Sequence, residues 1–329
     1  MSHESISKKR YVYADFTKLF AMFIVTWGHC SQCLSDDLFP FMFGRQGLFI
    51  SFHMPLFMMI SGFFINPSEI HRKSWIRFVK NKFFRLVVPA MVWYILYCLL
   101  TLHKPIFSNL FFFYWFLTSM FLSYCIIGVV CKISRQWVFY IISVICVIII
   151  PGSWILHLNF MYPMIWGGYF LSLIMSNMNE GTKRICVVLL CIMSIFFLWK
   201  WDVRNSVYLS PFNVVGASYK MLYALIFRLL TGGVIGSFFI ICFERYEKSS
   251  LFHKIGGYGK YTLVMYTASF ILNGIMSNFL HFYRFSISVP YLLEIASLVW
   301  TVIVCTFSIY IAIICMKYSV TKKILMGYF

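Results

Sequence analysis

Long runs of apolar residues recur along the whole chain, separated by short polar segments. Runs of this length with few or no charges are typical of helices that cross a membrane. No soluble domain fits between two runs, so we expect one integral membrane domain over residues 1–329, with an all-α fold. The pattern predicts about ten transmembrane helices, at residues 12–33, 46–66, 83–102, 109–131, 136–151, 158–176, 184–200, 219–243, 260–281 and 291–316.

Composition supports a polytopic membrane protein. Of the 329 residues, 61% are hydrophobic and only 12% are charged, which is about half the charged fraction of a soluble domain. The polar start of the sequence runs straight into the first apolar run without a small-residue cleavage site. We therefore expect the first helix to remain in the protein.

The distribution of basic residues predicts an orientation. With ten helices both termini lie on one side, which holds 20 of the 28 Lys and Arg residues, from Lys8–Arg10 to Lys317, Lys322 and Lys323. Because basic loops stay inside the cell, both termini should be cytoplasmic. The net charge of +18 is then mostly a property of cytoplasmic loops, and we expect no nucleic acid partner.

The first apolar run carries three ionisable residues: Asp15, Lys18 and His29. At about 100° per residue, Lys18 and His29 lie only about 20° apart around a helix and are separated by a rise of roughly 16 Å. Asp15 precedes Lys18 by three residues, a spacing that favours an ion pair. Ionisable groups inside a membrane usually face the protein interior or a watery cavity, so this face is a candidate functional site.

Two more polar residues fall inside apolar runs. His53 lies about 10 Å from the outer end of the second run, near the predicted depth of His29. Either histidine alone could be an ordinary hydrogen-bonded residue, but two at matching depth favour proton transfer. Arg228 lies near the middle of the eighth run; it stays charged, so we expect it to bind a substrate or to join helices.

The most basic segment is the predicted cytoplasmic loop 67–82, which runs on into the third apolar run. One interpretation is orientation of the protein together with attraction of anionic membrane lipids. The other is a binding site for a phosphate-rich ligand, although no glycine-rich phosphate loop is present. The candidate ligand-binding residues are Arg72, Lys73, Arg77, Lys82 and Arg85.

Cys30 and Cys33 form a C-x-x-C motif at the end of the first apolar run. A redox pair, or a metal site with His29, is one interpretation, but the chain has no second ligand pair at zinc-like spacing. Buried cysteine commonly behaves as a small hydrophobic residue. We expect a structural role, with no metal site and no bound cofactor.

Together these motifs resemble the acyltransferase 3 family of membrane-bound acyltransferases, in its fucose 4-O-acetylase-like branch. The matching features, in chain order, are the D-x-x-K…H pattern of Asp15, Lys18 and His29, FHMPLF…SGFF at 52–64, KFFRLVVP at 82–89, YWFL at 114–117 and GKYTLVMY at 259–266. Three positions depart from the usual pattern: Lys18 stands where many members have Arg, Pro55 where the larger branch has Asp, and Ser269 where His is common.

The resemblance implies a membrane-bound O-acyltransferase that takes an acyl group, usually acetyl, from cytoplasmic acetyl-CoA. The acceptor would be a sugar hydroxyl of a surface glycan or of its lipid-linked precursor, in the cytoplasmic (inner) membrane of a bacterium. The implied partners are thus acetyl-CoA, the glycan or lipid-linked sugar, and membrane lipids. A glycan or anion transporter (flippase) is the alternative, since it too would place Arg and His inside the membrane.

Under the acyltransferase hypothesis, His29 is the general base for the acceptor hydroxyl, or carries the acetyl group briefly. His53 is its partner, or hydrogen-bonds the acceptor. Lys18 and Arg228 bind phosphate or stabilise oxyanion charge. The basic segment at 72–85 holds the phosphates of the donor.

Overall fold

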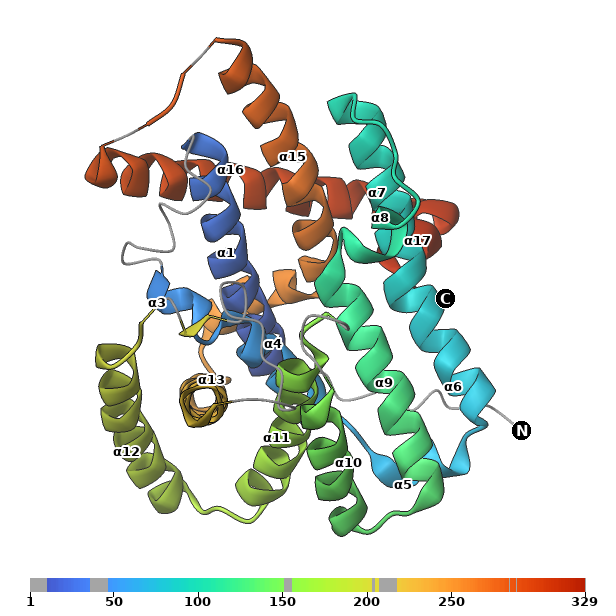
Figure 1. Cartoon of the computed structure of the whole chain (residues 1–329), viewed down its shortest axis with the longest axis vertical. Coiled ribbons are helices and arrows are strands. Elements are labelled where there is room, and N and C mark those ends of the chain that lie inside the picture. The colour runs from blue at the N-terminus through green and yellow to red at the C-terminus, as the bar shows by residue number, and fades with distance from the viewer. Residues whose placement is uncertain are drawn as a thin grey trace.

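The computed structural model of the chain describes residues 11–35, 47–150, 156–202, 205–206, 218–283, 285–287 and 289–328. Every regular element in these ranges is a helix, which confirms the predicted all-α fold. The helices (Figure 1) are α1 (Val12–Leu34), α3 (Gly47–Ile50), α4 (His53–Phe63), α5 (Pro67–Arg72), α6 (Trp75–Lys82), η1 (Phe83–Val87), α7 (Val88–Thr101), α8 (Asn109–Phe112), α9 (Trp115–Ile133), α10 (Trp137–Ile149), α11 (Leu158–Ser176), α12 (Glu180–Trp199), α13 (Tyr219–Arg245), α14 (Ser250–Gly256), η3 (Gly257–Tyr261), α15 (Thr262–Phe282), α16 (Pro290–Lys317) and α17 (Ser319–Met326).

Each predicted apolar run contains a helix, and six helical stretches in the described part of the chain are long and apolar enough to cross a membrane. They are Trp75–Thr101, Trp115–Ile133, Glu180–Trp199, Tyr219–Arg245, Ser250–Phe282 and Tyr291–Lys317. Gly47–Phe63 and Trp137–Ile149 are apolar but shorter, and α1 and α11 contain more polar residues and glycine. The count of ten and the cytoplasmic termini therefore stay predictions, and Lys8–Arg10 lie outside the described residues.

The second predicted run, 46–66, is a broken helix rather than a continuous one. Its first part is α3; a turn at Ser51 and Phe52 then leads into α4. Pro55 accounts for the break, because proline has no N–H and its ring would clash with the Ser51 carbonyl of a continuing helix. Pro55 is tolerated where it stands, in the first turn of α4.

The basic segment 67–82, predicted as a loop, is helical instead. It forms α5 and α6, and α6 continues through η1 and α7 as one stretch, Trp75–Thr101. Apolar and basic side chains alternate at helical spacing in α6 without Gly or Pro, so an amphipathic helix is favoured. In η1 the helix widens to a π-turn, with an i→i−5 hydrogen bond from Val88 N–H to Phe83 O. The wider turn accommodates Pro89, which would otherwise clash with the Arg85 carbonyl.

Helix α4 lies in the middle of the molecule, packed against α1, α11 and α13 (Figure 1). Its crossing with α11 is reciprocal: a Cβ on Gly62 would lie 1.8 Å from Ile165 O, and one on Gly168 would lie 1.9 Å from Met59 O. Only glycine permits such an approach of two backbones, a packing mode common between membrane helices. Gly62, part of the SGFF motif, is therefore a packing residue.

Candidate functional site

An apolar cavity of about 140 Å³ lies inside the helix bundle, beside α4. Five elements line it: α1, α4, η1, α9 and α15. Their lining residues are Met22 and Val25; Met54, Phe57 and Ser61; Leu86; Phe116, Leu117 and Met120; and Thr262, Leu263 and Tyr266. Such a space suits a slender, largely uncharged chain rather than an ion or a sugar.

A second cavity, of about 260 Å³, is strongly basic. Lys82, Arg85 and Lys260 line it together with Tyr124, and Lys82 Nζ lies 3.5 Å from the centre of the Tyr124 ring. No acidic residue lines this cavity in the part of the chain that the structure describes. Three cations without a carboxylate favour a polyanion such as a phosphorylated ligand.

The two cavities adjoin, because Leu86 and Met120 line both. The two cavities therefore share a wall at Leu86 of η1 and Met120 of α9. The π-turn matters here: Arg85 faces the basic cavity while Leu86, the next residue, borders both. We call this combined space the basic-to-apolar path.

His29 lies just beyond the apolar cavity. On α1, Met22 and Val25 line the cavity, and His29 follows one turn after Val25 on the same face. Its imidazole packs against Phe270, which in turn contacts the cavity residue Tyr266 at 5.4 Å between ring centres. His29 Nδ1 and Gln32 Oε1 lie 3.1 Å apart. With Nδ1 donating to that amide oxygen, Nε2 is the basic nitrogen of His29.

His53 is buried at the first turn of α4, and its Nδ1 donates to the Phe49 carbonyl across 2.7 Å. A carbonyl only accepts hydrogen bonds, so this bond fixes the tautomer and leaves Nε2 as the acceptor nitrogen. His53 and His29 lie within electrostatic range of each other.

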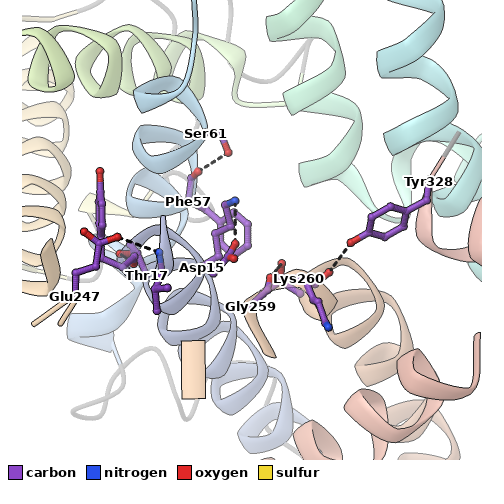
Figure 2. Close-up of polar contacts among 12 residues, drawn as sticks. Asp15, Thr17, Phe57, Ser61, Glu247, Gly259, Lys260 and Tyr328 are labelled. Atoms are coloured by element: carbon purple, nitrogen blue, oxygen red, sulfur yellow. Dashed lines mark hydrogen bonds and ion pairs between the residues drawn. The ribbon is translucent and has the colours of Figure 1, made fainter. Parts of the chain in front are cut away.

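Asp15 and Lys18 form the predicted pair, with 3.7 Å between the carboxylate and Lys18 Nζ. They lie toward the start of α1, where a Cβ on Gly259 would be only 2.0 Å from Asp15 O. Figure 2 shows Asp15 close to Gly259 and Lys260 of η3. Lys18 precedes Met22 by one turn, so α1 carries Lys18, two cavity residues and His29 along one face.

Arg228 lies apart from the apolar cavity. It is buried on α13, whose Gly232 and Gly236 pack against Pro55 and Met59 of α4. The cavity is lined by a different face of α4, the one that carries Met54, Phe57 and Ser61. Arg228 interacts electrostatically with His157, which precedes α11.

The five basic residues predicted to hold a donor divide into two groups. Lys82 and Arg85 line the basic cavity. Arg72, Lys73 and Arg77 are exposed on α5, on α6 and between them, outside both cavities, and Lys73 pairs with Glu69 at 2.5 Å. Lys260, absent from the sequence prediction, takes part in the cavity instead.

The two cysteines of the C-x-x-C motif hold α1 to α15. Cys30 Sγ donates to the Asn273 side chain at 3.4 Å and Cys33 Sγ to the Asn273 carbonyl at 3.2 Å. Trp300 of α16 donates to the same side-chain oxygen at 2.9 Å. These contacts support the predicted structural role for both sulfurs.

Comparison with known proteins identifies the family to which this chain belongs. The family model described as an acyltransferase domain, Acyl_transf_3, matches residues 11–317. This is most of the chain, and the protein therefore belongs to the acyltransferase 3 family. No curated protein and no solved structure matches the chain. A membrane acyltransferase fits both this family and the six helical stretches of the described residues that are long and apolar enough to cross a membrane.

Sequence reasoning missed most of the residues that line the cavities, among them Lys260, Tyr266 and Tyr328. Lys260 and Tyr266 both belong to the GKYTLVMY motif at 259–266, so this motif could have pointed to them as site residues. Tyr328 follows the last helix and belongs to no motif that the sequence analysis identified.

Proposed function

We propose that this protein is an acyl-CoA-dependent O-acyltransferase that moves an acyl group, in the simplest case acetyl, to a sugar hydroxyl. The acceptor is a surface glycan or its lipid-linked precursor at the cytoplasmic (inner) membrane of a bacterium. One observation carries the proposal: two adjoining cavities reach from Lys82, Arg85 and Lys260 to Tyr266, whose neighbour Phe270 packs against His29.

The shape of acyl-CoA fits this path. Its nucleotide end carries phosphates, which the three cations of the basic cavity would hold. Its pantetheine arm is thin and uncharged, as the apolar cavity requires. The thioester would then lie at the Tyr266–Phe270 end, within reach of His29. Holding both reactants there supplies proximity, which lowers the barrier substantially.

In this proposal His29 Nε2 accepts the proton of the sugar hydroxyl. The hydroxyl oxygen forms a C–O bond to the thioester carbonyl carbon, the C–S bond breaks, and the proton passes on to the departing thiolate. His53, with its tautomer set by Phe49, presents Nε2 as a hydrogen-bond acceptor for the sugar.

The charged side chains take supporting roles in the proposal. Asp15 holds Lys18 beside the path, where its ammonium group offsets negative charge on the donor. We assign Arg228, on the other side of α4 from the apolar cavity, to binding of the acceptor rather than the donor.

The test is transfer by purified full-length protein in liposomes supplied with radiolabelled acetyl-CoA and a glycan extract. We expect label in glycan with the wild type and none with His29→Ala, with both proteins equally present in the membrane. Transfer of label by His29→Ala at the wild-type rate would exclude His29 as the base that accepts the hydroxyl proton. Glycan movement across the membrane without acetyl-CoA would instead favour the flippase alternative.

A further inference from the structure

The wall of the basic cavity includes a segment beyond the family match. The match ends at residue 317, whereas Met326, Gly327 and Tyr328 line the cavity. They belong to helix α17 and the two residues that follow it. The cavity is therefore completed by residues outside the matched domain.

This C-terminal segment, residues 319–328, is firmly attached at two points. Trp93 Nε1 of α7 donates to the Leu325 carbonyl at 3.0 Å. Gly327 has a φ of +68° and ends α17, with its N–H bonded to Lys323 O at 2.9 Å. A Cβ there would meet Arg85 O at 2.5 Å, so glycine is required both for the left-handed turn and for the approach to η1.

The turn at Gly327 directs Tyr328 toward Lys260. The Tyr328 hydroxyl donates to the Lys260 carbonyl oxygen across 3.5 Å. Figure 2 marks this contact with a dashed line. The Tyr328 side chain is half-buried, and Lys322 Nζ lies 5.7 Å from its ring centre. The turn at Gly327 fixes the backbone of Tyr328, and the Lys260 carbonyl holds its hydroxyl. The Tyr328 ring thus lies beside the three cations of the cavity.

A second aromatic residue, Tyr124, lines the same cavity but is less suited to take a ligand. It is buried, and Lys82 Nζ covers its ring at 3.5 Å from the centre. Of the two rings, that of Tyr328 is the more exposed. Aromatic side chains next to cations form the usual platform for nucleotide bases, since every base has a π-face that stacks.

We propose that Tyr328 stacks on the purine base of a nucleotide-bearing donor whose phosphates are held by Lys82, Arg85 and Lys260. This inference rests on the proposed function, since it names a subsite of the same donor path. Segment 319–328 then contributes to donor choice by binding the nucleotide rather than the acyl group.

The test compares two donors in liposomes containing the full chain: acetyl-CoA, and S-acetylpantetheine, which lacks the nucleotide. We expect Tyr328→Ala to raise KM for acetyl-CoA about tenfold, at the lower end of the effect of losing a stacked base. Its kcat, and its KM for S-acetylpantetheine, should stay at wild-type values. Tyr328→Phe keeps the ring and should behave as the wild type, as should Tyr310→Ala, whose exposed ring lies on α16.

Two results would overturn the subsite. One is an unchanged KM for acetyl-CoA in Tyr328→Ala; the other is an equal rise for both donors, which indicates a structural role. Binding of adenosine 3′,5′-bisphosphate to the same proteins, measured without any acyl group, separates this inference from the proposed function. Weaker binding by Tyr328→Ala supports the subsite even if no transfer occurs, and equal or absent binding contradicts it.

Discussion

The imidazole of His29 rests on the ring of Phe270, with 4.6 Å between the two ring centres. Phe270 also contacts Tyr266, which lines the apolar cavity, so one aromatic pair separates that cavity from His29. This contact places the proposed base at the inner end of the donor path.

Phe270→Ala should lower kcat by about 100-fold, because a base displaced by about 1 Å loses roughly that much rate. KM for acetyl-CoA should stay near the wild-type value, since the basic cavity is unchanged. Steady-state transfer kinetics measure both quantities. Phe279→Ala, on an exposed position of the same helix, is the matched control. A rise in KM with unchanged kcat would contradict the positioning role.

The crossing of α4 and α11 predicts a contrast between adjacent glycines. Gly168→Ala forces a Cβ into Met59 O and should destabilise the fold by about 1–3 kcal/mol. At Gly167 a Cβ meets nothing within 4 Å, so Gly167→Ala should be neutral or stabilising, by up to about 1 kcal/mol. Thermal unfolding in detergent measures the difference. Equal midpoints for the two variants would show that the helices do not cross as described.

Filling the apolar cavity should block transfer without unfolding the protein. Val25 lines the cavity, so Val25→Phe places a ring in the space proposed for the pantetheine arm. We expect the rate of transfer to fall at least tenfold. The free energy of unfolding should change by less than the roughly 1–3 kcal/mol that a larger side chain costs in a fully packed core. Val129→Phe adds the same ring at an exposed position. Full activity of Val25→Phe would place the acyl chain elsewhere.

The basic cavity predicts which cations bind the donor. Replacing both Arg85 and Lys260 by Gln should raise KM for acetyl-CoA by at least tenfold, since each charge-assisted bond to phosphate contributes about 1.5–3 kcal/mol. The same change at Arg72 and Arg77, outside the cavity, should leave KM near the wild-type value. These KM values should also depend on salt, which weakens exposed charge pairs. If KM rose in the Arg72 and Arg77 double variant and not in the Arg85 and Lys260 double variant, the donor site would lie at α5 and the start of α6 instead.

Helical periodicity predicted part of the face of α1 in advance. The placement of Lys18 and His29 on one face follows from their spacing in the sequence, and so does the ion pair of Asp15 with Lys18. Each predicted apolar run also contains a helix. These features are local, so the period of the chain is sufficient to predict them.

The missed features depend on contacts between distant segments. Lys260 of η3 joins Lys82 and Arg85 only because η3 lies at the same cavity as the junction of α6 with η1. Arg72 and Arg77 could not be separated from Arg85 by charge alone, since all lie in one basic stretch. The break before α4 was visible in Pro55, but hydropathy alone favoured a continuous run.

The most direct test of the account is a structure of the full-length protein with CoA bound, determined in a lipid nanodisc. We predict phosphate density against Lys82, Arg85 and Lys260. The pantetheine arm should pass Leu86 and Met120, with the thiol near Tyr266 and Phe270. CoA bound outside this path, for instance along Arg72 and Arg77, would contradict the central claim that the path delivers an acyl donor to His29.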